Sequence, residues 1–188
     1  MSTAELYGLP STITAGGEKY TIRTDFRAVL DVLIACNDPE LDDEARTVVM
    51  LEILLPGWED IPQEHLQEAA ERLVQFIDCG QKDDGKAHPR VVDWEQDAAI
   101  IIPAVNSVAH TDIRAAVQLH WWTFFSYFME IRESLFSNVL SIRQKKAKGK
   151  KLEKYEEEFY RENRAIIDLK KPETDEIRAE KENILKYL

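Results

Sequence analysis

The sequence predicts a mainly α-helical fold, a bundle of about five to seven helices preceded by a short β-hairpin. Hydrophobic residues recur at helical spacings of three and four along most of the chain, whereas strand-like alternation is confined to residues 11–23. Segments rich in proline or glycine separate the helical stretches. With 188 residues, 44% of them hydrophobic and 31% charged, the chain can enclose one sizeable core.

The β-hairpin is expected over residues 11–23. Bulky side chains stand at Ile13, Tyr20 and Ile22, and Gly16-Gly17 can adopt the positive φ angles that a tight turn requires. A two-stranded hairpin by itself is only marginally stable in water. This one should therefore pack against the helices or pair with another copy of the chain.

Three helices are expected between the hairpin and Gly80, each bounded by residues that favour helix ends. The first is capped by Thr24 or Asp25 and ends near Asn37, the second opens at Asp42 or Asp43 and ends near Leu55, and the third starts at Pro62.

A polar segment, residues 80–90, follows the third helix and is expected to be a mobile loop, because it combines charged residues with glycine and proline. A fourth helix is expected over residues 94–108, headed by Asp93. Pro103 lies inside it and should kink or split it, because proline removes one backbone hydrogen bond.

The most hydrophobic segment predicts a long central helix that opens at Asp112 and extends through Ile142. Six of the nine residues from Trp121 to Met129 are aromatic and none is charged. Buried rings cover about 150–250 Å² each, so these six represent on the order of 20–35 kcal/mol of apolar burial. The run is shorter than the roughly 20 apolar residues that span a membrane. On such a helix the hydrophobic residues form two stripes on different faces. The first consists of Val117, Trp121, Phe124, Phe128, Ile131, Leu135, Val139 and Ile142. The second consists of Trp122, Phe125, Met129, Phe136 and Leu140.

The C-terminal part, residues 143–188, is expected to be a charged helical extension, packed on or flexibly attached to a domain formed by residues 1–142. Its basic block, residues 143–154, is more typical of a solvent-exposed turn than of a nucleic-acid site. A hydrophobic seam then predicts an amphipathic helix ending at Lys171-Pro172, with a short helix in the tail 173–188. The seam consists of Leu152, Tyr155, Phe159, Ile166 and Leu169.

Composition and motifs disfavour several classes of function. The net charge of −11 disfavours binding of nucleic acid through overall charge. Cys36 and Cys79 form no CxxC pair, and the N-terminus lacks the pattern of a secretory signal. No phosphate-binding, dinucleotide-binding, hydrolase or HExxH motif occurs. We therefore expect neither catalysis nor a metal or other cofactor, and we expect His120 to be a core-edge residue.

Four segments carry recognisable motifs: Leu-His-Trp-Trp-x-Phe at 119–124 with the downstream Ile142-Arg143, Tyr7–Pro10, Tyr20–Arg27 and Asp93–Asp97. Together they resemble the gene-product-fifteen family of long-tailed phages and prophages of Gram-positive bacteria. The resemblance covers nearly the whole chain, and its most specific element is the motif at 119–124 with Ile142-Arg143.

The resemblance implies a tail assembly chaperone in the cytoplasm of the host bacterium. Such a protein would bind the tape-measure protein, help tail-tube subunits polymerise around it, and leave the finished virion. A structural tail or head–tail joining protein is the first alternative, and a nucleic-acid-binding regulator is the second. The chain could also form homo-oligomers.

A chaperone of helical clients needs apolar surface that its own core does not cover. Trp121 and Phe128 are expected to pack inside the protein, whereas for other residues packing and partner binding both stay open. The candidate partner-binding residues are Trp122, Phe125, Met129, Leu152, Tyr155, Phe159 and Ile166.

Overall fold

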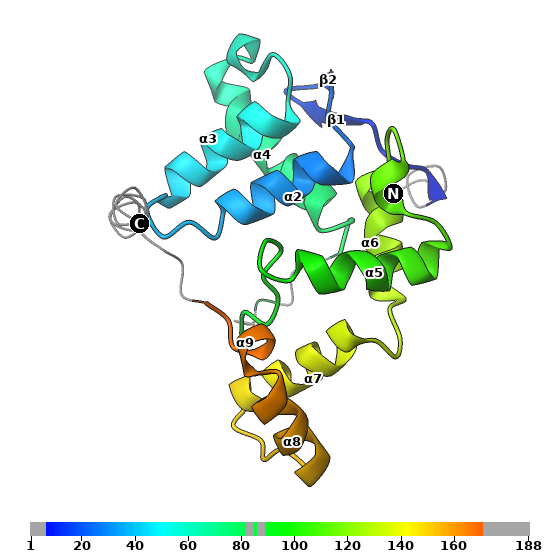
Figure 1. The fold of residues 1–188 in the computed structure, drawn as a ribbon. Helices are drawn as coiled ribbons and strands as arrows, with labels where there is room; N and C mark the ends of the chain where they lie inside the picture. Colours follow the sequence, from blue (N-terminus) through cyan, green and yellow to red (C-terminus); the bar gives the residue numbers. More distant parts are fainter. Residues whose placement is uncertain (1–6, 82–84, 86–88, 171–188) are drawn as a thin grey trace, which may run out of the picture.

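A computed structural model describes residues 7–81, 85 and 89–170 of the chain (Figure 1). These residues form a mainly helical fold with one two-stranded antiparallel hairpin, as the sequence predicts. Most of the predicted loop 80–90 and the predicted tail helix over 173–188 lie outside the described residues. The described ranges contain eight α-helices, because two helices predicted as continuous are each divided.

The hairpin consists of β1 (Thr12–Ala15) and β2 (Glu18–Thr21), paired so that Ile13 lies opposite Tyr20. Gly16 and Gly17 form the turn with φ angles of 58° and 83°, the left-handed region that glycine adopts at little cost. Strand β1 packs against helix α4 (Gln63–Ile77), and the Gly16 N–H donates a hydrogen bond of 2.9 Å to the carboxylate of Glu68. The hairpin is therefore stabilised by a helix of its own chain.

The two turn glycines give a matched test of this docking. An alanine at either position incurs the cost of a left-handed backbone, about 1–2 kcal/mol. A Cβ at Gly16 would also overlap the imidazole of His65, whereas a Cβ at Gly17 meets nothing within 4 Å. We expect Gly16→Ala to lower the free energy of unfolding by about 1–3 kcal/mol more than Gly17→Ala, the usual cost of overpacking. Urea denaturation measures both; equal losses would show that the turn is not held against α4.

Three helices follow with the predicted boundaries: α2 (Phe26–Ala35), α3 (Asp43–Leu54) and α4. The carboxylate of Asp25 accepts from the Arg27 N–H, and that of Asp42 accepts from the Ala45 N–H, so both predicted caps are confirmed. Helix α3 packs against both α2 and α4, joined to α4 by a short 3₁₀ turn, η1 (Trp58–Asp60). These helices and the hairpin enclose the first half of the core.

Helix α5 (Ala98–Ala109) begins later than predicted, because residues 94–97 form a turn. The carboxylate of Asp93 accepts the N–H groups of Glu95 and Gln96 at this turn. The helix then continues through Pro103, so the predicted split at this residue does not occur.

The predicted continuous helix from Asp112 to Ile142 is wrong. The segment is divided into a 3₁₀ turn, η2 (Ile113–Ala115), and two helices, α6 (Trp121–Met129) and α7 (Leu135–Ala147). Side-chain caps explain the division, because each offers the backbone N–H groups of a new helix an acceptor. His120 Nδ1 accepts from the Trp122 N–H at the start of α6, and Ser134 and Ser137 form a reciprocal capping box at the start of α7. Val117, predicted to face the core, lies in the link before α6 and is 100% exposed.

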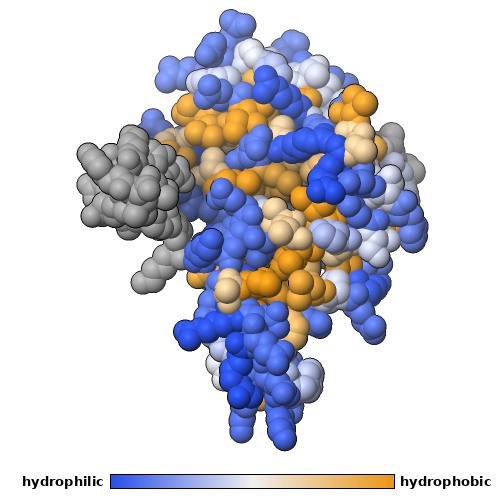
Figure 2. All heavy atoms as spheres, in the orientation of Figure 1, coloured by the Kyte–Doolittle hydropathy of each residue, from blue (hydrophilic) through white to orange (hydrophobic). Residues whose placement is uncertain are grey.

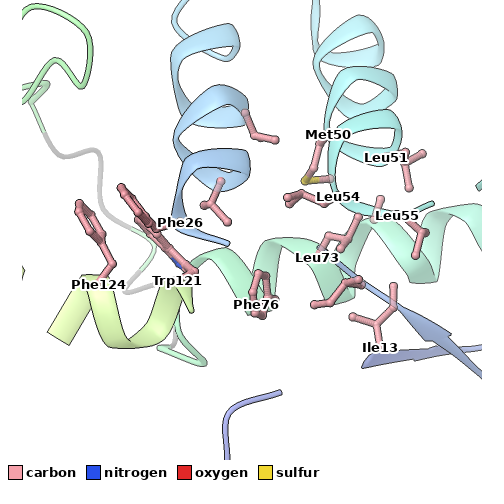
Figure 3. Close-up of a cluster of buried hydrophobic side chains, with 14 of the residues drawn as sticks. Ile13, Phe26, Met50, Leu51, Leu54, Leu55, Leu73, Phe76, Trp121 and Phe124 are labelled. Carbon is pink, nitrogen blue, oxygen red and sulfur yellow. The ribbon is translucent and has the colours of Figure 1, made fainter. Parts of the chain in front are cut away.

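Helix α6 is joined to the start of α2 and buries the most aromatic part of the core. The Phe26 N–H donates to the Leu119 carbonyl at 2.9 Å, and the Trp121 N–H donates to the Thr24 carbonyl at 2.7 Å. Figure 3 shows Phe26, Trp121 and Phe124 grouped at one side of the core, with the leucines of α3 and α4 beyond them. The rings of Phe26 and Phe124 stack at a centroid distance of 4.7 Å. The predicted burial of Trp121 is confirmed.

The predicted amphipathic helix over residues 152–169 is also divided. Helix α8 (Lys154–Glu162) ends at Asn163, whose side-chain amide donates to the Phe159 carbonyl at 3.0 Å, and α9 (Arg164–Ile167) follows. Because of this division, Ile167 packs with Val139 and Ile142 in a small second core, whereas Ile166 is 36% exposed. Helices α7, α8 and α9 lie at the end of the molecule opposite the hairpin (Figure 1).

Candidate functional site

A groove lies between helices α7 and α8 and has a volume of about 210 Å³. This is less than the roughly 300–1,000 Å³ of typical small-molecule sites, so the groove fits one protruding side chain better than a cofactor. Three residues of each helix line it: Asn138, Ser141 and Ile142 from α7, and Tyr155, Glu156 and Phe159 from α8.

The apolar part of the groove comes from a buried floor and an exposed rim. Ile142 is 2% exposed and belongs to the small second core, against which Phe159 packs half-buried. Tyr155 is 71% exposed. Aromatic side chains in this position can cover an apolar group of a partner at small conformational cost.

The carboxylate of Glu156, which also lines the groove, already has hydrogen-bond partners within the protein. It accepts from Lys145 Nζ at 2.6 and 2.7 Å and from the Glu153 N–H at 2.9 Å. The hydrogen bonds from Lys145 and from that N–H lower the pKa of Glu156 below its ordinary value, and the same ion pair raises the pKa of Lys145. Both groups therefore stay charged near neutral pH and join α7 to α8.

Arg143 fastens α7 and α9 to the start of α5. Its side chain is 5% exposed and meets the carboxylate of Asp97, itself 1% exposed, through two parallel hydrogen bonds of 2.6 and 2.8 Å. The remaining donors reach the carbonyls of Ile167 at 2.7 Å, Ile166 at 2.8 Å and Val91 at 2.9 Å. All five N–H donors of the guanidinium are thus satisfied. The prediction that Arg143 belongs to a solvent-exposed basic block is wrong.

Residues 148–153 of the basic block form the exposed turn that the sequence predicts, whereas residues 144–147 belong to the end of α7. Helix α7 ends in a Schellman motif, in which Gly149, with a φ of 63°, donates to the Lys146 carbonyl at 3.0 Å and Lys150 donates to the Lys145 carbonyl at 2.8 Å. We use "tip lysines" for the four exposed lysines on and just after this turn. They are Lys148, Lys150, Lys151 and Lys154.

The structure brings two of the seven candidate partner-binding residues into the groove, Tyr155 and Phe159. Trp122 and Phe125 are half-buried on α6; Trp122 stacks on Phe76 at a centroid distance of 6.4 Å and donates to its carbonyl at 2.9 Å. Met129 is 59% exposed at the end of α6, outside the groove lining. Leu152 packs half-buried on the second core, and Ile166 lies on α9. Whether these residues bind a partner stays a prediction.

Sequence reasoning missed the polar side of the site. Glu156 pairs with a lysine eleven residues away across the turn, and the alternation of basic and acidic blocks is the signal that could have suggested an α7–α8 hairpin. Asp97 and Arg143 are 46 residues apart, and no local pattern connects them.

In the part of the chain that the structure describes, every helix is too short or too polar to span a membrane. The same residues contain no group of three or more His, Cys, Asp or Glu side chains that could hold a metal ion.

The model of one protein family, described as Bacteriophage Gp15 protein, matches residues 7–169. Comparison with curated proteins and with solved structures found no match. The matched range includes all four segments that carry the resemblance noted in the sequence, as well as the groove and the Arg143–Asp97 pair. It covers most of the 188 residues, and the chain therefore belongs to the Bacteriophage Gp15 protein family.

Proposed function

We propose that this phage protein is a non-catalytic assembly chaperone that binds the tape-measure protein in the host cytoplasm. It would keep that long helical protein available while tail-tube subunits polymerise around it. Membership of a bacteriophage family supports a role in the phage life cycle. The choice of a chaperone among phage functions rests on the groove between α7 and α8.

The observation that carries the proposal is an exposed aromatic rim beside a preformed apolar floor. Tyr155 is 71% exposed although Ile142, on the floor, is 2% exposed. A helical client can insert one apolar side chain into such a groove and cover the tyrosine ring. Because Arg143 and Glu156 already fix the surrounding helices, little ordering is needed on binding, which favours affinity.

A binding role also agrees with the chemistry of the groove. Its one carboxylate, Glu156, is occupied by Lys145 and by the Glu153 N–H. The other polar lining side chains are Asn138, Ser141 and the phenol of Tyr155. This set can position a partner, and it supports our proposal that the protein acts by binding.

The direct test is co-purification of the tape-measure protein with the full chain. We expect Tyr155→Ala to reduce capture by about tenfold, as for the loss of an interface anchor. Its effect on unfolding should stay within about 0.5 kcal/mol, because the side chain is largely exposed. Tyr7→Ala is the matched control, since Tyr7 is 87% exposed and lies outside the groove. Failure of the unmodified chain to capture the tape-measure protein would contradict the proposal.

Mass spectrometry of purified virions separates the chaperone from the first alternative. A chaperone should be absent or present in trace amounts, because it leaves before the tail is complete. Abundant copies in finished tails would instead assign the protein to the structural tail or head–tail joining proteins.

A further inference from the structure

We infer that the groove between α7 and α8 recognises an amphipathic helix that carries acidic residues beside its apolar anchor. The tip lysines would contact those acidic residues while Tyr155 and Phe159 hold the anchor. This inference rests on the proposed function and adds to it the chemistry of the client segment.

The tip lysines form a concentrated positive charge on a protein whose net charge is −11. Two neighbouring lysines already have acidic partners: Lys145 pairs with Glu156 at 2.6 Å, and Lys146 pairs with Asp168 at 2.8 Å. Within the described ranges, none of the four tip-lysine side chains has a hydrogen-bond or ion-pair partner. Four unpaired cations on one short turn favour an anionic partner.

The backbone holds these cations in place. The Schellman motif around Gly149 fixes the end of α7, and the capping box of Glu153 and Glu156 fixes the start of α8. A charged group on an ordered turn loses less conformational entropy on binding than one on a flexible tail.

The tip lysines also lie at one end of the groove. Helices α7 and α8 run antiparallel, because Lys145 pairs with Glu156 while Ile142, one turn earlier, lines the groove with Phe159. The turn is therefore next to the Tyr155 end, and Lys154 directly precedes that tyrosine. A helix rises about 5.4 Å per turn, so a client anchored in the groove would present its next turn to the tip lysines.

The small size of the groove requires this second contact. A volume of about 210 Å³ accepts an anchor side chain and little more. Around it, the end of the molecule formed by α7 and α8 is mainly hydrophilic on the face shown in Figure 2. Stable interfaces bury about 1,200–2,000 Å², so the contact with a partner must extend from the groove to the tip lysines. Charged contacts of this kind supply specificity and speed association.

Charge on the rest of α8 favours a protein partner over nucleic acid. Glu157, Glu158 and Glu162 are exposed on the same helix. A continuous phosphate backbone that extends beyond the tip lysines would approach these carboxylates. The resulting repulsion would offset the free energy of counterion release that drives nucleic-acid binding. Discrete acidic side chains beside an apolar anchor avoid that repulsion.

Two synthetic helical peptides of about 18 residues test the inference. Both carry the same leucine and phenylalanine stripe, one flanked by glutamates and the other by lysines. In fluorescence anisotropy with the full chain, we expect the glutamate peptide to bind at least about tenfold more tightly, with a preference that weakens as salt screens the charges. Equal binding of both peptides, or stronger binding of the lysine peptide, would overturn the inference.

Charge reversal locates the contact. The double variant Lys150→Glu, Lys151→Glu should lose the preference for the glutamate peptide. The control Lys19→Glu, Arg23→Glu makes the same change in net charge at exposed positions near the hairpin, at the opposite end of the molecule (Figure 1), and should keep the preference. Equal loss in both variants would mean that overall charge decides binding, which overturns the inference.

The capture test and the peptide test together separate this inference from the proposed function. If the full chain captures the tape-measure protein but shows no preference for the glutamate peptide, the inference is wrong and the proposed function stands. If the preference is present and depends on Lys150 and Lys151 but the tape-measure protein is not captured, the chemistry of the groove is supported and the proposed client is wrong. Binding of a DNA duplex through these lysines, without a preference between the peptides, would replace the inference with a nucleic-acid site.

Discussion

Replacing Arg143 with methionine is expected to lower the free energy of unfolding by about 3–5 kcal/mol, the usual cost of removing one partner of a buried ion pair. The substitution leaves the carboxylate of Asp97, 1% exposed, without its cation. It also removes the donors to the carbonyls of Val91, Ile166 and Ile167. Urea denaturation followed by circular dichroism measures the loss. Hydrogen exchange should show increased opening of α7–α9 first, because Arg143 joins them to the start of α5.

Two controls isolate the buried pair. Arg161→Met makes the same chemical change at an exposed position of α8 and should alter stability by less than about 0.5 kcal/mol. Arg143→Met combined with Asp97→Leu should recover part of the loss, because it no longer leaves a buried charge unpaired. Recovery should be incomplete, since Asp97 also accepts the Asp93 N–H at 2.9 Å. A loss below about 1 kcal/mol for Arg143→Met alone would show that water reaches Asp97.

Replacing Trp121 with alanine is expected to cost about 3–5 kcal/mol, the range for large aromatic residues in a core. Trp121 is 1% exposed, its ring lies 5.6 Å from that of Phe124, and its indole N–H donates to the Ile77 carbonyl at 2.8 Å. Truncation therefore creates a cavity and removes the N–H donor to a carbonyl of α4, which keeps only the weak contact from the Cys79 thiol at 3.8 Å. Thermal and urea unfolding measure the effect.

Substitutions at and near this position show which contact matters. Trp121→Phe should cost less than Trp121→Ala, because it keeps an aromatic ring and loses the hydrogen bond to Ile77. Val117→Ala removes a side chain that is 100% exposed and should change stability by less than about 0.5 kcal/mol. If Trp121→Ala were tolerated as well as Val117→Ala, the aromatic segment would not be the centre of the core.

Most of the predicted elements that depend on neighbouring residues agree with the structure. Gly16-Gly17 forms the hairpin turn, and Asp25 and Asp42 cap α2 and α3. These features follow from interactions within a few residues. The division before α7 is also local, but the pair Ser134 and Ser137 lacks the glutamate or glutamine that marks the usual capping box. Unbroken hydrophobic spacing across residues 130–134 then favoured one long helix.

The candidate site was only partly predictable. The hydrophobic seam identified Tyr155 and Phe159 as possible contacts, and both line the groove. The same seam includes Ile166, for which packing and partner binding were both open, whereas the structure buries Ile167 and leaves Ile166 36% exposed. Periodicity assumes an unbroken helix, and the break at Asn163 rotates every later side chain.

The sequence by itself determined the helical class, the hairpin, the burial of Trp121 and, through its motifs, the phage family. Each depends on short-range patterns or on hydrophobic content, which any fold of this chain must satisfy. Only the tertiary structure decided that Arg143 is a buried clamp on Asp97 and that a groove forms between α7 and α8. Those features depend on contacts between distant residues, and a linear pattern of charges does not state which of them meet.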